Sequence, residues 1–189
     1  TYDGTGDRRI KIAWGQMESF GGCFTGQMLF PTEVRLDCVD GKYRLATLPI
    51  PELAALRTET KTWEKAATQD NPLIEYLTGG AYEITIRFRP DTAAMAVELY
   101  GLRLRILPAE NILELPDRVV PLSYNYTGRE VRLLIDTLSM EVFADEGRIY
   151  TALNCETDLR DRQFTLAPVR ASQACDVAVS FSPLGDIWE

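Results

Sequence analysis

Paired carboxylates are the side chains whose types and spacing first suggest chemistry in this sequence. Glu141 and Asp145 lie four residues apart in a segment with strand-like alternation, which places both on one face. Two carboxylates that flank one bond are the machinery of glycoside hydrolysis. Phe143 lies between them on the same face, however, and charges on strands are mostly solvated. We therefore interpret the two as solvated strand charges and not as a catalytic pair.

Few other residues are candidates for chemistry. Glu75, Glu83 and Glu98 alternate with apolar residues, which indicates outward-facing strand positions. The sequence has no histidine, so the commonest general base and the Ser-His-Asp and Cys-His arrangements are absent. It also has no cluster of metal ligands and no phosphate-binding glycine loop. We therefore expect no metal, no cofactor and no catalytic residue in this chain.

The cysteines and aromatic residues allow more than one interpretation. We interpret the cysteines as small buried hydrophobic residues, although Cys23 and Cys38 could form a disulfide in an oxidising compartment. Tyr124 and Tyr126 have the spacing of one strand face, which is compatible with stacking on a neutral sugar, so they are candidate substrate-binding residues. Core or interlayer packing is expected for Trp14, as for Trp188.

Charge and hydropathy restrict the partners of the 189-residue chain. The formal net charge is −8, which argues against unaided binding to nucleic acid or to an anionic membrane. No apolar run approaches the roughly 20 residues needed to cross a bilayer. The first six residues are polar and do not resemble a signal peptide.

The segment from Val131 to Tyr150 organises the predicted fold. Apolar residues alternate with mixed ones at 131–135 and again at 140–144, with turn residues between and after the two runs. A third extended segment begins at Ile149. The pattern predicts a three-stranded antiparallel meander whose apolar face needs a second sheet to cover it.

The remaining chain adds short strands separated by turn residues. Asp40-Gly41 predicts a hairpin, and Glu52 to Arg57 a single helical turn after Pro51. The polar segment from Thr58 to Asn71 is interpreted as a surface excursion. Further strands are expected at 10–14, 33–39, 42–48, 73–77, 82–88, 95–100, 102–107, 111–115, 163–167 and 175–181. Short strands at regular spacing indicate an all-β sandwich of two antiparallel sheets, not βαβ units.

Two stretches resemble the C-terminal part of glycoside hydrolase family 32, the invertase, levanase and inulinase family. RRIKIAWGQM at 8–17, GQMLFPTEVRL at 26–36 and LPIPELAALR at 48–57 are similar to the family's last propeller strand and the segments after it. LLIDTLSMEVFADEGRIYTA at 133–152 is similar to its Asp-x-Ser-x-Glu-Val-Phe-x-x-x-Gly-x-x-Thr signature. This sequence departs from the family at Ala13, where the family has glycine, and at Thr32, where it has arginine.

The resemblance implies a jelly-roll or concanavalin-like β-sandwich with a leading strand left over from a β-propeller blade. Residues 1–30 would be the end of the last blade and its connection, and residues 31–189 the C-terminal β-sandwich domain. The family's catalytic motifs, Trp-x-Asn-Asp-Pro-Asn-Gly, Arg-Asp-Pro and Glu-Cys, are absent, so this chain alone is not expected to be an enzyme. The implied partner is an N-terminal propeller of the same enzyme. The implied parent is a secreted or periplasmic glycosidase acting on fructans or sucrose.

Three function classes stay open at this point. A module cut from its propeller should expose an apolar patch at the candidate interdomain residues Trp14, Met28, Phe30 and Pro31. A free-standing carbohydrate-binding module should be polar there and should bind fructan or another neutral glycan. A purely structural or oligomerising module would share the sequence features of the module cut from its propeller and would differ from it only in making no glycan contact. The sequence leaves open the parent's substrate, its compartment and its oligomeric state.

Overall fold

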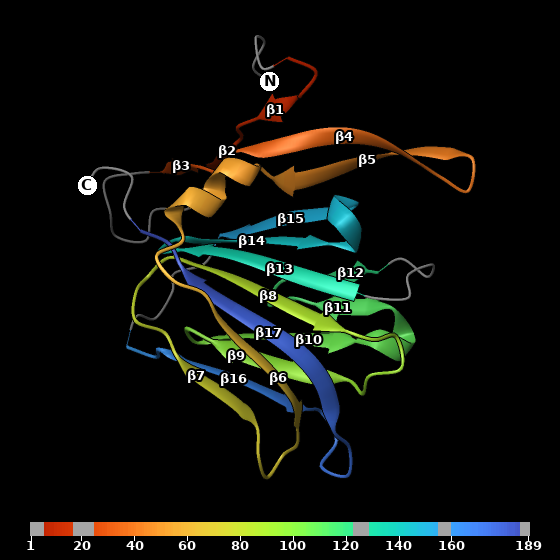
Figure 1. Cartoon of the computed structure of the whole chain (residues 1–189), viewed down its shortest axis with the longest axis vertical. Coiled ribbons are helices and arrows are strands. Elements are labelled where there is room, and N and C mark those ends of the chain that lie inside the picture. The colour runs from red at the N-terminus through yellow and green to blue at the C-terminus, as the bar shows by residue number, and fades with distance from the viewer. Residues whose placement is uncertain (1–5, 17–24, 123–128, 155–159, 186–189) are drawn as a thin grey trace.

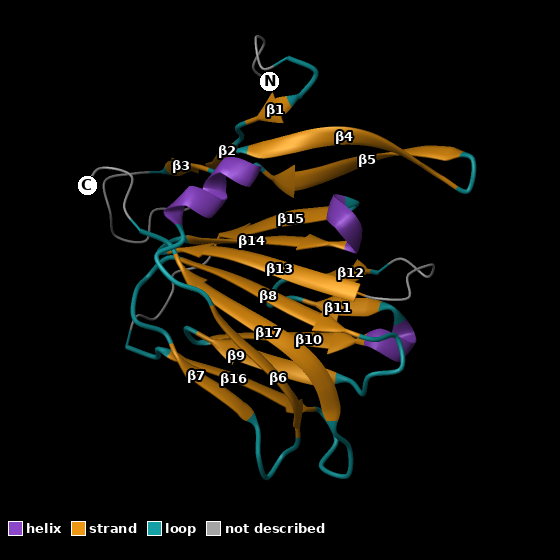
Figure 2. Cartoon of the chain, in the orientation of Figure 1, coloured by secondary structure: helices purple, strands orange, loops and turns teal. Residues whose placement is uncertain are grey.

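Antiparallel strands make up most of the structure, a computed structural model that describes residues 6–16, 25–122, 129–154 and 160–185 (Figures 1 and 2). Two six-stranded sheets face each other and enclose the core. This arrangement confirms the predicted all-β sandwich.

The first of these sheets, here called the meander sheet, has the strand order β15-β14-β13-β8-β17-β6. Val131 pairs with Ala144 and Phe143 pairs with Tyr150, so β13, β14 and β15 form the predicted meander. The strands are β6 (Lys61–Ala67), β8 (Tyr82–Phe88), β13 (Arg129–Asp136), β14 (Ser139–Ala144), β15 (Ile149–Asn154) and β17 (Cys175–Pro183).

The second sheet has the order β12-β11-β10-β9-β16-β7. Its strands are β7 (Leu73–Tyr76), β9 (Met95–Leu99), β10 (Leu102–Leu107), β11 (Ile112–Glu114), β12 (Val119–Pro121) and β16 (Gln163–Pro168), with the short 3-10 helix η2 (Pro108–Glu110) after β10. The sequence predicted these strands apart from β12.

The main core lies between the two sheets. Ile84, Leu133 and Val142 of the meander sheet point into it, and the rings of Phe164 and Phe181 meet edge to face with centroids 4.8 Å apart. Burying each such side chain contributes about 1.5–3 kcal/mol. The alternation read from the sequence therefore assigns the core-facing positions of the meander correctly.

A smaller set of strands, here called the leading layer, covers part of the outer face of the meander sheet, at the end formed by β14 and β15. It consists of a three-stranded sheet β1-β4-β5 and a β2–β3 pair, and Figure 1 shows it on the side of β15. Its elements are β1 (Ile10–Lys11), β2 (Trp14–Gln16), β3 (Gly26–Met28), β4 (Thr32–Val39) and β5 (Lys42–Pro49).

The β4–β5 hairpin turns at Asp40-Gly41, as predicted. Both residues have positive φ, 51° and 72°, which suits a two-residue hairpin turn. The hairpin pairs with β1 and with neither sandwich sheet. The division of the chain at residues 30 and 31 remains a prediction.

Strand β14 of the meander sheet is consequently buried on both faces. Leu134 and Phe143, on its outer face, pack with Leu53 of the 3-10 helix η1 (Pro51–Leu56), which matches the predicted helical turn. At this part of the molecule there are therefore three layers: the second sheet, the meander sheet, and the leading layer with η1.

The prediction of a surface excursion at 58–71 is wrong. Lys61–Ala67 forms strand β6, which pairs with β17 at the edge of the meander sheet. An edge strand tolerates charged side chains, and for this reason the polar sequence of β6 was mistaken for that of a loop. Trp63, its large apolar residue, donates a hydrogen bond from Nε1 to Glu75 of β7 at 2.9 Å.

Candidate functional site

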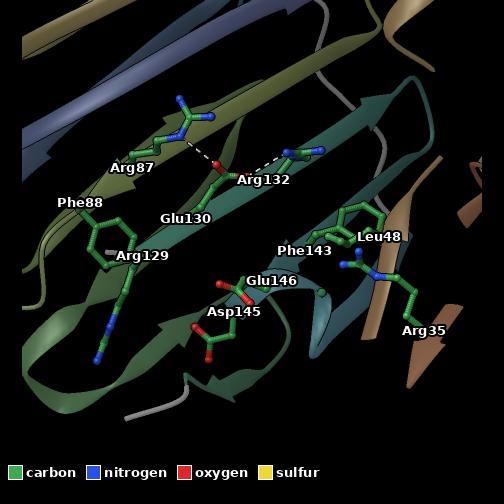
Figure 3. A pocket seen from close by; sticks show the side chains of 12 residues that line it. Arg35, Leu48, Arg87, Phe88, Arg129, Glu130, Arg132, Phe143, Asp145 and Glu146 are labelled. Atoms are coloured by element: carbon green, nitrogen blue, oxygen red, sulfur yellow. Dashed lines mark hydrogen bonds and ion pairs between the residues drawn. The ribbon is translucent and has the colours of Figure 1, made fainter. Parts of the chain in front are cut away.

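A cavity of about 470 Å³ lies between the leading layer and the meander sheet (Figure 3). Segments far apart in the sequence line it: β4 and β5 of the leading layer on one side, and β8, β13 and the end of β14 on the other. The lining residues are Arg35, Leu48, Arg87, Phe88, Arg129, Glu130, Arg132 and the turn 143–147, which contains the short 3-10 helix η3 (Asp145–Gly147).

The lining of this cavity contains both guanidinium and carboxylate groups. Glu130 accepts hydrogen bonds from Arg87 Nε and Arg132 Nη2, both at 2.9 Å, and so joins β8 to β13 (Figure 3). Arg35 points from β4 into the cavity and has no hydrogen-bond or ion-pair partner among the described residues. A mixture of strong donors and acceptors suits a neutral polar ligand such as a sugar.

Arg129 has a structural part in this lining. It is buried and donates from Nη1 to the carbonyl oxygen of Pro108 at 3.1 Å and from Nη2 to Asn111 Oδ1. Asn111 ends helix η2 in a left-handed conformation. Arg129 therefore ties the meander sheet to the second sheet at one end of the cavity.

The interpretation of Glu141 and Asp145 as solvated charges is wrong, because the leading layer covers this part of the meander. Both are buried. Glu141 Oε1 accepts the Phe30 backbone N–H at 2.7 Å, and Oε2 accepts the Tyr150 hydroxyl at 2.7 Å. Asp145 lines the cavity and Glu141 does not. The two carboxylates therefore have separate surroundings, and Glu141 holds the connection between β3 and β4 onto the sandwich.

Burial raises the pKa of Glu141, and the hydrogen bonds from Tyr150 and Phe30 and the charge of Lys11 oppose that rise only in part. The same burial, together with the bond to Glu141, raises the pKa of Tyr150. Lys11 Nζ lies 4.6 Å from the centre of the Tyr150 ring. Glu141 is thus a costly charge in a contact between layers.

Glu141→Gln is expected to remove part of the pH dependence of stability. Because the folded-state pKa is raised, Glu141 contributes stability below its ordinary value of about 4.5, and that contribution is lost as the pH rises through the raised pKa. Urea unfolding from acidic to neutral pH should therefore show the wild type losing stability relative to the variant. Glu98→Gln, at an exposed position, is the matched control. Parallel stability curves for wild type and Glu141→Gln would contradict the assignment.

The candidate interdomain residues differ in exposure. Trp14 and Met28 lie opposite each other in the β2–β3 pair and are 63% and 67% exposed, so the expected packing of Trp14 in the core is wrong. Phe30 and Pro31 are half-buried, and Phe30 packs against the cluster of Leu53 and Phe143. Contact of all four residues with a further domain remains a prediction.

Other candidate residues fall into two groups. Tyr124, Tyr126 and Trp188 lie outside the described residues, as do Cys23 and Cys155. Cys175 is buried as predicted, and burial raises the pKa of its thiol to about 11. Cys38 is an exposed free thiol, so its predicted burial is wrong, because its face of β4 has no covering layer among the described residues.

Of the three glutamates predicted to face outward, Glu98 is exposed, Glu75 is half-buried and Glu83 is buried. Glu83 forms an ion pair with Arg57, which follows η1 and lies over the outer face of β8. The arginines of the cavity were not among the candidate residues predicted from the sequence. Their outward positions alternate with core residues in β8 and β13, but only the topology brings them together.

None of the helices in the described part of the chain has the length and apolar character needed to cross a membrane. No group of three or more His, Cys, Asp or Glu side chains in that part of the chain is placed to hold a metal ion.

Fold and cavity together define a two-sheet β-sandwich module with an attached strand layer. No protein-family model matches the chain. A levanase from Bacillus sp. (strain L7) is 28% identical in a match that covers 75% of this chain and 19% of the levanase. The likeness in sequence and fold confirms the resemblance to the C-terminal β-sandwich module of glycoside hydrolase family 32.

Solved structures agree on the fold. An exo-inulinase from Aspergillus awamori has a TM-score of 0.73 at 14% identity, over 95% of this chain and 41% of that one. A family 32 β-fructofuranosidase from Bombyx mori has a TM-score of 0.71 at 18% identity, over 97% and 39%. The chain therefore spans about a fifth of the levanase and about two fifths of these solved neighbours.

Proposed function

We propose that this chain is the C-terminal β-sandwich module of a family 32 enzyme that hydrolyses fructans or sucrose. In this proposal the module stabilises an N-terminal catalytic propeller and borders its substrate cleft. The observation that carries it is the match of nearly the whole chain to less than half of an exo-inulinase and a β-fructofuranosidase. The exposed Trp14 and Met28 support it, since exposed apolar patches mark interaction sites.

Hydrolysis is assigned to the propeller of the parent enzyme. A retaining glycosidase needs two carboxylates about 5–5.5 Å apart on either side of the scissile bond. The chain lacks the family's three catalytic motifs, and Phe30 and Tyr150 already occupy both oxygens of the buried Glu141. The module would act by holding the propeller and not by touching the reacting atoms.

The test compares the 189-residue chain with its full-length parent. Reducing-sugar assays with levan, inulin and sucrose should give hydrolysis by the parent and none by the chain. Hydrolysis by the chain that survives repurification would contradict the assignment of the chemistry to the propeller. An inactive parent would contradict the assignment of the parent as a fructan- or sucrose-cleaving enzyme.

A second candidate function is carbohydrate binding without catalysis, and the cavity beside Arg35 favours it. Calorimetry with levan and inulin should then give dissociation constants of about 1 mM or tighter. Arg35→Ala should weaken that binding if the cavity is the site, and Tyr124→Ala with Tyr126→Ala should weaken it if the tyrosines are. Arg103→Ala, at an exposed pair with Glu98, is the control. Absence of any binding would contradict this second function.

A further inference from the structure

The cavity between the leading layer and the meander sheet carries a surplus of positive charge. Four guanidinium groups and three carboxylates line it, whereas the whole chain has a formal net charge of −8. The surplus is therefore local and opposite in sign to the charge of the molecule. A cleft of one sign with walls of low dielectric concentrates ions of the other sign, so this lining favours an anion.

Arg129 is the buried part of this surplus. It is 6% exposed, and it forms no ion pair with a carboxylate among the described residues. Its two terminal nitrogens donate to uncharged acceptors, the carbonyl oxygen of Pro108 and the side chain of Asn111. Its buried Nε has no hydrogen-bond partner in the described part of the chain. Buried charges are normally paired and buried donors normally have acceptors, so Arg129 can take both from a ligand.

Two further arginines bring donors to the same cavity. Arg132 Nε is buried and makes no hydrogen bond among the described residues, although it has an ion pair with Glu83 at 3.7 Å. Arg35 extends from β4 on the other wall, and it has no partner in the part of the chain that the structure describes (Figure 3). A ligand between the hairpin and β13 would therefore meet guanidinium donors from both walls.

The carboxylates of the lining, in contrast, already have partners. Glu130 accepts hydrogen bonds from two arginines, and Glu146 accepts one from Arg148 at 3.2 Å. Asp145 is engaged as well. A ligand that completes this lining must therefore supply acceptors. An oxyanion offers acceptors alone, whereas each hydroxyl group of a neutral sugar also brings a donor.

We propose that this cavity binds a small ligand through a phosphate-type oxyanion, carried on a sugar or free in solution. The inference goes beyond the proposed function, because the site lies within this chain, and it assigns an anionic ligand where the second candidate function places a neutral glycan. Guanidinium groups bind phosphate oxygens through short, charge-assisted hydrogen bonds. Leu48 and Phe143 add apolar walls to a cavity of about 470 Å³, which leaves room for the carbon skeleton of a sugar.

Calorimetric titration of the 189-residue chain, in a buffer without phosphate, compares glucose 6-phosphate, inorganic phosphate and glucose. We expect glucose 6-phosphate to bind at least about tenfold more tightly than glucose, because only the phosphate supplies the charge and the acceptors that the arginines can use. The affinity for glucose 6-phosphate should fall when salt is added, since ions screen the attraction. The affinity for glucose should not change with salt.

Arg35→Gln is the variant that places the binding in this cavity. The side chain is exposed, so the thermal midpoint should stay at the wild-type value, while the affinity for both phosphates should fall about tenfold or more. Arg103→Gln is the matched control, because it removes the same charge from an exposed pair with Glu98 in the second sheet. Arg129 is unsuitable for this comparison, since it also joins the two sheets.

Each outcome decides the inference. Equal affinities for glucose and glucose 6-phosphate would overturn it, as would binding that Arg35→Gln leaves unchanged or no binding of either phosphate at about 10 mM. Inorganic phosphate that binds as tightly as glucose 6-phosphate would support the site and identify the free ion as its ligand. Weaker binding of inorganic phosphate would support a phosphorylated sugar. A parent that cleaves no fructan or sucrose would contradict the proposed function and leave this site unaffected.

Discussion

Replacing Arg57 with methionine is expected to lower the free energy of unfolding by about 2–3 kcal/mol. Glu83 is buried, and its two oxygens accept hydrogen bonds from Arg57 Nε at 2.7 Å and Nη2 at 2.9 Å. Without the guanidinium, the carboxylate stays buried and, among the described residues, keeps a longer ion pair with Arg132, at 3.7 Å. The expected loss is below that of a fully buried pair because the Arg57 side chain is 36% exposed.

A double-mutant cycle isolates this effect. In a Glu83→Gln background the cost of Arg57→Met should shrink to about 1 kcal/mol or less, because no buried charge is left unpaired. Arg103→Met breaks an exposed pair with Glu98 and should cost at most about 1 kcal/mol. Urea unfolding measures all of these variants. Equal losses at Arg57 and Arg103, or an undiminished loss in the Glu83→Gln background, would contradict the role given to Glu83.

Gly147→Ala is expected to lower stability by about 3 kcal/mol, from two causes. Gly147 has φ of +86°, a conformation that costs an L-residue about 1–2 kcal/mol. A methyl group there would also lie 2.6 Å from the backbone oxygen of Thr47, and overpacking of this kind costs about 1–3 kcal/mol. Because Thr47 belongs to β5, the variant should also loosen the hairpin from the sandwich. The thermal midpoint should fall by roughly 6–12 °C.

Gly41→Ala separates the two causes. Gly41 has a similar φ of +72°, but an added methyl group would meet nothing within 4 Å. Its cost should be limited to backbone strain, about 1–2 kcal/mol. Calorimetry gives the thermal midpoints, and limited proteolysis of the β4–β5 hairpin reports its attachment. Equal midpoints for the two variants, with no added cleavage in Gly147→Ala, would mean that the contact between η3 and β5 contributes nothing.

The meander could be predicted from the sequence because its information is local. Alternation at 131–135 and 140–144 and turn residues at 145–147 determine strand, face and connection within a short stretch. Alternation identifies two faces, but it does not tell what covers them. Glu141 was therefore assigned to solvent, although the leading layer buries it against Phe30 and Tyr150.

The missed features depend on contacts between distant parts of the chain. β6 has the composition of a loop and is a strand because Cys175–Phe181 pairs with it. The cavity combines Arg35, Arg87 and Arg132, from three strands that no local pattern connects. The exposed apolar face of the β4–β5 hairpin does have a pattern in the sequence, since Leu36 and Leu45 lie next to charged residues on either side of Asp40-Gly41. The same alternation is typical of a strand within the sandwich. Only the sheet topology shows that β4 and β5 belong to neither sandwich sheet.

The strand order has a consequence for the synthesis of the protein. The last two strands, β16 and β17, lie inside their sheets, β16 between β9 and β7 and β17 between β8 and β6. Until they leave the ribosome, β6 and β7 have no partners and the end of each sheet beyond β8 or β9 stays unformed. Folding of such non-local pairings is slow, and the waiting chain is prone to aggregation. The nascent chain must therefore be kept soluble until nearly its last described residues have been made.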